Sequence, residues 1–169
     1  SLFSLPLLPP PAPYIPFLPT PPLFHTGLPP SPSLAVAPSA RLLLLPYSGS
    51  LEVWRLGSSQ HRSGALGTVL PLSEQPEKVL EVAAKQGERI VCSAIHPEGS
   101  YLAYSSCSRL RLLRLSKVEG GAPSLARVPV QGAGIALQLS LYTAEGGDRL
   151  LVCPVAGGVT VYALGEGGA

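Results

Sequence analysis

From residue 34 onward, the chain alternates between short apolar runs and polar turns. The runs are four to eight residues long, and Gly, Ser and Pro residues separate them. No segment keeps the 3.6-residue period of an amphipathic helix. The closest is Glu77–Lys85, which fits two helical turns about as well as it fits a strand followed by a turn at Gly87. Short strands at regular spacing predict an all-β sandwich, barrel or propeller.

One six-residue pattern, apolar-x-apolar-apolar-x-apolar, occurs three times. Its copies are LEVWRL at 51–56, LRLLRL at 110–115 and VTVYAL at 159–164. Each copy follows a tight turn, and a second apolar run precedes each turn, at 42–45, 101–104 and 150–153. The offset between run and copy is nearly constant, at nine, eight and nine residues. Such a repeat indicates one supersecondary unit used three times.

The second and third copies carry a further apolar run upstream, at 89–95 and 135–141, and each run ends in a polar turn. Strand, turn, strand, tight turn, strand is the meander of a propeller blade, and positions that are apolar on both faces suit a sheet packed between two neighbours. Polar outer strands are expected at 78–83 and 124–130. We therefore predict an incomplete WD-repeat β-propeller over 34–169, of about three four-stranded blades, and keep a β-sandwich as the alternative. The blades are expected at about 34–84, 89–130 and 134–165, the last without its outer strand.

The repeated pattern lacks the Asp that follows the Trp in a typical WD repeat. Its fourth position holds Trp54, Leu113 and Tyr162. The next position, where Asp is usual, holds Arg55, Arg114 and Ala163. We therefore expect the Asp-centred hydrogen-bond network to be missing and apolar packing to hold the blades together. Propellers close with four to eight blades, so we also expect the chain to be part of a longer protein.

Residues 1–33 have a different composition. They hold 12 of the 20 prolines, which favours extended polyproline II geometry over a packed domain. We predict a disordered or non-native segment here. The stretches 13–16 and 16–19 fit the P-x-x-P motif of SH3 and WW ligands, but no Arg or Lys occurs before Arg41, whereas SH3 ligands normally carry a flanking basic residue.

Composition excludes several classes of protein. Hydrophobic residues make up 46% of the chain and charged residues 13%, which excludes charge-driven disorder over most of its length. The net charge of +2 is too small to indicate a nucleic-acid surface by itself. The longest aliphatic run, 42–45, is far shorter than the roughly 20 residues of a membrane-spanning helix. The three cysteines have neither zinc-site spacing nor the even number of a disulfide framework.

Residues suited to catalysis are sparse. Asp148 is the only Asp and lies in a Gly-rich stretch that predicts a turn, so a Ser-His-Asp triad would need it or a Glu. No Gly-x-Ser-x-Gly elbow is present. Gly132–Gly134 resembles the start of a dinucleotide fingerprint, but Leu137 replaces the third Gly, which favours a turn. His96, before Pro97, is also interpreted as a turn residue. We expect no enzymatic activity and no cofactor, metal or small-molecule site.

The candidate contact residues are Arg109 and Arg111, which share one face of a predicted strand. They could contact RNA phosphate or an acidic partner segment. The alternative is structural: Arg109 would lie in a surface turn, while Arg111 and Arg114 would lay their aliphatic stems along neighbouring blades.

The stretches LEVWRLGSS (51–59), TVLPLSE (68–74) and ERIVCSAIHPEGSYLAYSSCSRLRLLRL (88–115) closely resemble the second half of the cirhin family. Its members are WD-repeat subunits of the t-UTP (UtpA) group in the small-subunit processome. The resemblance covers roughly residues 28–165, with the order and spacing of all three units.

This resemblance implies a non-catalytic scaffold in the nucleolus that supports pre-rRNA transcription and small-subunit rRNA processing. Its implied partners are other WD-repeat processome subunits, with pre-rRNA or a small nucleolar ribonucleoprotein as a further candidate, and no membrane. The alternative function is a WD-repeat protein-interaction adaptor in another intracellular pathway.

Overall fold

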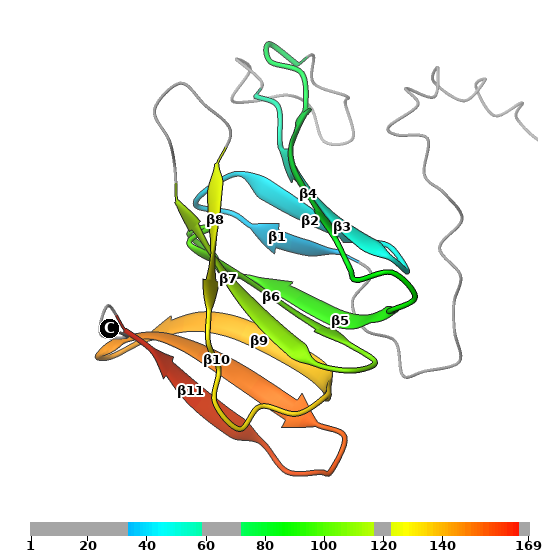
Figure 1. The fold of residues 1–169 in the computed structure, drawn as a ribbon. Helices are drawn as coiled ribbons and strands as arrows, with labels where there is room; N and C mark the ends of the chain where they lie inside the picture. The colour runs from blue at the N-terminus through cyan, green and yellow to red at the C-terminus, as the bar shows by residue number, and fades with distance from the viewer. Residues whose placement is uncertain (1–33, 59–71, 117–122, 166–169) are drawn as a thin grey trace, which may run out of the picture.

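In the computed structural model, residues 34–58, 72–116 and 123–165 are described, and within them eleven β-strands form three antiparallel sheets (Figure 1). The first sheet contains β1 (Ala35–Ala37), β2 (Leu42–Pro46), β3 (Ser50–Arg55) and β4 (Glu77–Ala83). The second contains β5 (Ile90–Ile95), β6 (Tyr101–Ser106), β7 (Leu110–Ser116) and β8 (Ser124–Val128). The third contains β9 (Ala136–Ala144), β10 (Gly147–Pro154) and β11 (Thr160–Leu164).

Each sheet is a meander in which strands pair in chain order. The three copies of the repeated pattern correspond to β3, β7 and β11, and the apolar run before each copy corresponds to β2, β6 and β10. The fold is therefore all-β and consistent with part of a WD-repeat propeller, as predicted. Residues 1–33 lie outside the described residues, so the predicted division of the chain at residue 33 and the disorder of that segment stay predictions.

The segment 77–85, which fitted a helix or a strand, forms strand β4. Its residues pair with β3 in antiparallel register, with Val82 opposite Leu51 and Leu80 opposite Val53. Both Leu80 and Val82 pack against a cluster of buried apolar side chains. Burial of alternate side chains, Leu80 and Val82, thus favours a strand over a helix in this segment.

The polar turn predicted after the apolar run 135–141, in the Gly-rich stretch that contains Asp148, is shorter in the structure. Strand β9 continues to Ala144 and β10 begins at Gly147, so Glu145 and Gly146 alone connect them. Gly146 and Gly147 adopt positive φ values of 87° and 113°, which glycine reaches without the steric cost of a Cβ atom. Asp148 accordingly lies inside β10, and its expected place in a turn was wrong.

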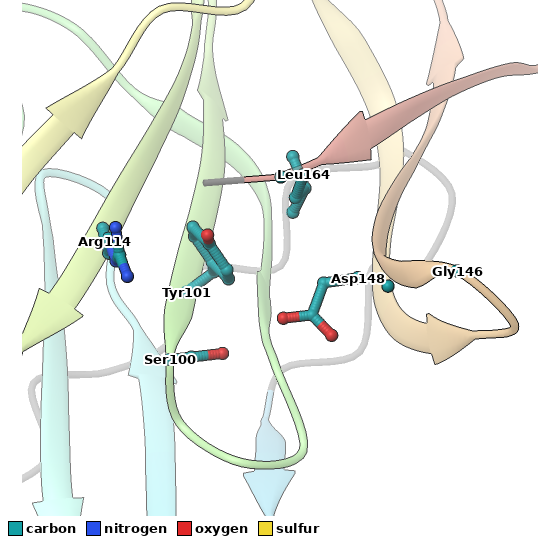
Figure 2. A pocket seen from close by; sticks show the side chains of 8 residues that line it. Ser100, Tyr101, Arg114, Gly146, Asp148 and Leu164 are labelled. Atoms are coloured by element: carbon teal, nitrogen blue, oxygen red, sulfur yellow. The ribbon is translucent and has the colours of Figure 1, made fainter. Parts of the chain in front are cut away.

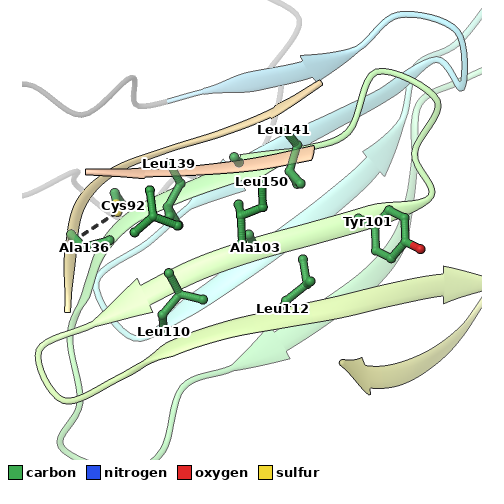
Figure 3. Close-up of a cluster of buried hydrophobic side chains, with 11 residues drawn as sticks. Cys92, Tyr101, Ala103, Leu110, Leu112, Ala136, Leu139, Leu141 and Leu150 are labelled. Atoms are coloured by element: carbon green, nitrogen blue, oxygen red, sulfur yellow. Dashed lines mark hydrogen bonds between the residues drawn. The ribbon is translucent and has the colours of Figure 1, made fainter. Parts of the chain in front are cut away.

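The second sheet is buried on both faces. All six residues of β6 are buried. One face contributes Cys92, Ala103 and Leu112 to a cluster shared with the third sheet, which Figure 3 shows. The other face contributes Ile95, Leu102 and Tyr104 to a cluster shared with the first sheet. This packing explains why the repeated pattern is apolar at positions of both parities.

Hydrogen bonds also join the second and third sheets within this core. The backbone N–H of Ala136 donates to Ser105 Oγ at 2.9 Å, and Cys92 Sγ donates to the Ala136 carbonyl at 3.3 Å. Both backbone groups of Ala136, at the start of β9, are therefore bonded to side chains of β5 and β6. The inner strands of adjacent sheets are held side by side, as in a propeller.

The meander sorts the connections between two ends of the molecule. At one end, named here the hairpin end, lie the tight turns of β2–β3, β6–β7 and β10–β11 and the connectors β4–β5 and β8–β9. At the opposite end lie the turns that join β1 to β2, β5 to β6 and β9 to β10 (Figure 1). The first two sheets are linked at the hairpin end by a backbone hydrogen bond of 2.9 Å from Ile90 N–H to the Ser48 carbonyl.

Trp54 does not lie between two of the described sheets. Its indole Nε1 donates to Glu52 Oε2 at 2.9 Å, on the face of the first sheet that points away from the second. Tyr47 also donates to this carboxylate, at 3.3 Å, and Lys78 lies 3.4 Å from its other oxygen. The Trp54 side chain is thus positioned by a carboxylate two residues earlier in its own strand.

The described part of the chain contains no helix that is long and apolar enough to cross a membrane.

Candidate functional site

The two arginines predicted as contact residues differ in exposure. Arg109 lies in the β6–β7 turn, and 43% of its side chain is exposed. Its guanidinium forms an ion pair of 3.3 Å with Glu88 and donates from Nε to Ser108 Oγ at 3.2 Å. Arg111 lies in β7 and is only partly exposed, and its Nε is buried without a hydrogen-bond partner among the described residues. A contact of either arginine with RNA or protein stays a prediction.

Glu88 holds the β6–β7 turn in place. Ser108 donates to its Oε1 at 2.7 Å, and the same oxygen pairs with Arg109. Hydrogen bonds from Ser108 and Ser106, helped by the charges of Arg109 and Arg111, lower the pKa of the Glu88 carboxyl. The carboxylate is therefore ionised at neutral pH, and its ion pair with Arg109 restrains the guanidinium of this exposed side chain.

Two further cations lie next to this turn, on the connector between β4 and β5. Lys85 and Arg89 are both exposed. The backbone of Arg89 contacts the turn directly, because the Cys107 N–H donates to its carbonyl at 3.1 Å. We name Lys85, Arg89 and Arg109 the basic rim. The sequence reasoning missed Lys85 and Arg89, although the predicted meander already brought the β4–β5 connector and the β6–β7 turn to the same end of the blade.

A second feature is an open hollow of about 340 Å³ between the second and third sheets, at the opposite end. Ser100, Tyr101 and Arg114 line it from the second sheet, and Asp148 and Leu164 line it from the third (Figure 2). Figure 2 shows the Asp148 carboxylate directed from β10 toward the strand that begins at Tyr101. The hollow therefore exposes part of a contact between two sheets.

Behind this hollow, the buried side chain of His96 connects the two sheets by hydrogen bonds. Its Nδ1 accepts from the Glu98 N–H at 3.3 Å and lies 3.0 Å from Ser100 Oγ. Its Nε2 lies 3.1 Å from Thr143 Oγ1 and 3.3 Å from Asp148 Oδ1. Because Nδ1 accepts the amide proton, the neutral ring carries its proton on Nε2 and donates it toward the third sheet.

This network corrects one sequence-based expectation. Apolar packing does not act alone, because a polar network that includes Asp148 joins the second and third sheets, with Thr143 donating to Asp148 Oδ1 at 3.1 Å. His96 begins a turn, as expected, and its imidazole is fully buried. Asp148 is supplied by the neighbouring sheet, from a position other than the one after the repeated Trp, Leu or Tyr.

Ser100, His96 and Asp148 have the residue types of a serine-hydrolase triad, lie in the same order in space, and were not expected to converge. Their surroundings differ from that site in two respects. The ring of His96 has no exposed surface, and the nitrogen nearest Ser100 already accepts the Glu98 amide. A general base needs that lone pair for the serine proton. The geometry therefore favours a structural role, in which His96 links the two sheets by hydrogen bonds, over a catalytic role in which Ser100 acts as a nucleophile.

Within the ranges 34–58, 72–116 and 123–165, no group of three or more His, Cys, Asp or Glu side chains could hold a metal ion. Cys92, Cys107 and Cys153 are all free thiols. Burial raises the pKa of Cys92 to about 12, so this thiol is protonated at neutral pH.

Comparison with known proteins points to one kind of relative, although no family model matches the chain. The mouse (Mus musculus) protein named U3 small nucleolar RNA-associated protein 4 homolog is 38% identical over 127 residues, which is 75% of this chain. The human (Homo sapiens) protein of the same name is 37% identical over the same share. U3 small nucleolar RNA-associated protein 4 of Schizosaccharomyces pombe is 31% identical over 90 residues, or 53% of this chain.

The chain is similar to U3 small nucleolar RNA-associated protein 4. That name denotes cirhin, so the comparisons agree with the resemblance that the motifs at 51–59 and 88–115 indicated. The matched part is a small share of each relative: it spans 18% of the mouse and human proteins and 11% of the yeast protein. The similarity therefore concerns one portion of a longer protein.

Proposed function

We propose that this chain is part of a WD-repeat scaffold in ribosome biogenesis, acting in the nucleolus as a component of the small-subunit processome. In that role it supports pre-rRNA transcription and small-subunit rRNA processing without catalysing a reaction. The observation that carries the proposal is the 37–38% identity, over 75% of the chain, to proteins named for their association with U3 small nucleolar RNA.

The architecture supports a role in presenting surfaces to partners. Three sheets pack face to face, and the second is buried on both sides, so the turns at the two ends keep fixed positions relative to one another. Such ends can present binding residues to other proteins or to RNA. The proposed partners are other WD-repeat subunits of the processome, together with pre-rRNA or the U3 ribonucleoprotein.

The proposal is tested by tagging the protein at its own locus and measuring U3 small nucleolar RNA and processome subunits in the purified material. We expect both to be enriched over an untagged strain. A Leu102→Asp variant is the control for folding, because Leu102 is fully buried between the first two sheets. Its recovery of U3 RNA should fall to background.

Two results would argue against the proposal. Recovery of subunits from another pathway, with no U3 RNA, would favour the adaptor function instead. Undiminished recovery of U3 RNA by Leu102→Asp would mean that the folded sheets do not make the contact.

A further inference from the structure

The charges of the described residues are divided unevenly between the two ends of the molecule. At the hairpin end, the turns and connectors carry three cations and one carboxylate, Lys85, Arg89, Arg109 and Glu88. At the opposite end, cations and carboxylates are mixed. The cations there are Arg41, Arg55, Lys78, Arg114 and Arg149, and the carboxylates are Glu74, Glu77, Glu98, Glu145 and Asp148. The small net charge of the chain therefore conceals a local excess of positive charge.

The single carboxylate at the hairpin end does not cancel this excess at the surface. Only 12% of the Glu88 side chain is exposed, and Ser108 and Arg109 share its Oε1. The carboxylate instead holds the Arg109 guanidinium by an ion pair, while 43% of the Arg109 side chain stays exposed. An arginine held in this way loses less side-chain entropy when it binds an anion.

The other two cations of the basic rim have no ion-pair partner among the described residues. No carboxylate oxygen lies within 4.0 Å of the Lys85 ammonium or the Arg89 guanidinium there, in contrast to Arg41, Arg55 and Lys78. The first two sheets bring these cations together, because Ile90 bonds to Ser48 on one side and Cys107 bonds to Arg89 on the other. The rim therefore combines two cations that have no ion-pair partner among the described residues with one, Arg109, that is paired with Glu88, and it carries a net excess of positive charge.

We propose that the basic rim of Lys85, Arg89 and Arg109 binds the phosphodiester backbone of single-stranded RNA. The proposal rests on the proposed function in ribosome biogenesis and assigns the RNA contact to one end of the molecule. The segments 47–50, 84–89 and 107–109 contain none of the exposed large apolar side chains of the described residues, which a peptide would need for side-chain recognition. They offer cations, hydroxyl groups and backbone amides, which suit phosphate oxygens.

The rim offers no exposed aromatic ring on which a base could stack. Tyr47, the one aromatic residue in these segments, donates its hydroxyl to Glu52 and is only partly exposed. Backbone contact without base contact predicts binding that depends on salt and little on sequence. Arg111, whose Nε is buried, is not assigned to the contact.

The experiment measures binding of the full chain, at nanomolar concentration, to fluorescent 20-nucleotide oligouridylate and oligoadenylate over a range of salt. Three phosphate contacts on a single strand predict a slope of log Kobs against log[salt] of about −2. Arg89→Ala should reduce the steepness by about 0.7, and Arg89→Ala/Arg109→Ala by about 1.4, with at least about tenfold weaker binding at low salt. The two RNAs should bind within about threefold of each other.

The matched control is Arg127→Ala, which removes the charge of another exposed arginine, on the outer strand β8 and outside the basic rim. Its slope should equal that of the unchanged chain. Arg89→Lys should restore the slope lost in Arg89→Ala, since lysine keeps the charge. Trp54 fluorescence and thermal unfolding check that each variant is folded, and Arg89→Ala, which removes no ion pair among the described residues, keeps the test valid if the double variant unfolds.

Three outcomes would overturn the proposal: unchanged slopes in both Arg89→Ala and the double variant, an equal loss in Arg127→Ala, or binding to polyglutamate in preference to RNA. The last would assign the rim to an acidic protein segment. These failures are distinguishable from failure of the proposed function. If U3 RNA is recovered from cells but the variants leave the salt slopes unchanged, the rim proposal alone is rejected. If the chain binds RNA with the expected salt dependence but recovers no U3 RNA from cells, the proposed function alone is rejected.

Discussion

Cys92 is buried between the second and third sheets, with 3% of its surface exposed. Burial raises the pKa of its thiol from 9.0 to about 12. The folded protein therefore holds this proton at pH values where the unfolded chain releases it. Its contribution to stability is complete below pH 9 and is lost as pH rises from 9 toward 12, by roughly 1 kcal/mol per pH unit.

The variant Cys92→Ala tests this dependence. At pH 7 it should be less stable than the unchanged chain by about 1 kcal/mol, because the sulfur leaves a cavity. The difference should shrink and then reverse above pH 9, as followed by urea unfolding with Trp54 fluorescence. Cys107→Ala, at an exposed thiol, is the control for loss of a buried sulfur and should be about as stable as the unchanged chain at pH 7. A constant difference for Cys92→Ala would contradict the prediction.

The hydrogen bond between His96 and Thr143 links two sheets, and a double-mutant cycle can measure it. Thr143→Val keeps the shape of the side chain and removes its hydroxyl, which should cost about 1 kcal/mol. His96→Ala should cost about 2–4 kcal/mol, because the ring is fully buried. We expect the double variant to be more stable than the sum predicts, with a coupling of about 1 kcal/mol in urea unfolding. Additive effects would show that the bond contributes nothing.

The sequence predicted the local position of some residues but not their distant hydrogen-bond partners. The structural alternative for Arg109 placed it in a surface turn, and the structure agrees, because Arg109 lies between β6 and β7. The partners of His96 could not be predicted, since Thr143 is 47 residues away and belongs to another sheet. The stacking of the sheets, rather than any local pattern, brings the two side chains together.

Among the elements, the turn between β5 and β6 is the most constrained by its neighbour. Gly99 has a φ of 72°, and a Cβ atom there would lie 2.8 Å from the Ala40 Cβ of the first sheet. Gly87 has a similar φ of 82°, but a Cβ atom there would have nothing within 4 Å. The pair therefore separates backbone strain from steric contact between sheets.

Gly99→Ala should destabilise the protein by about 2–4 kcal/mol, since strain at positive φ and the clash with Ala40 add. Gly87→Ala should cost only about 1–2 kcal/mol, from the strain alone. Thermal unfolding of both variants measures the difference. Equal losses would mean that the first two sheets shift to accommodate the methyl group.

Strands were predictable where a run of apolar residues repeated. Residues 110–115 gave the position of β7 because their pattern matched 51–56 and 159–164. The three-residue strand β1 was not predicted individually, since Ala35–Ala37 is too short to show a period and, among the described residues, pairs only with β2. The ambiguity over 77–85 was resolved by pairing with β3, a contact that the local pattern does not contain.

For the whole molecule, apolar positions on both faces of a strand predicted that sheets would stack. The buried second sheet bears this out. The distribution of charge was harder to predict, because residues 85, 89 and 109 become neighbours only when the β4–β5 connector lies beside the β6–β7 turn. Net charge, summed along the chain, contains no information on this arrangement.

The exposed edge of the third sheet leads us to expect that the 169-residue chain, expressed alone, associates with itself. Within the part of the chain that the structure describes, strand β11 lies at the sheet edge and pairs only with β10, and Val159 and Val161 are 63% and 51% exposed. Exposed apolar edge strands pair with other chains. We expect the molar mass in light scattering to rise with concentration above the 17.5 kDa of one chain. Val159→Lys/Val161→Lys should shift it toward one chain, because charge on an edge opposes pairing, whereas Leu125→Lys, on the outer strand of the second sheet, should not. A chain that stays monomeric at every concentration would show that this edge is protected.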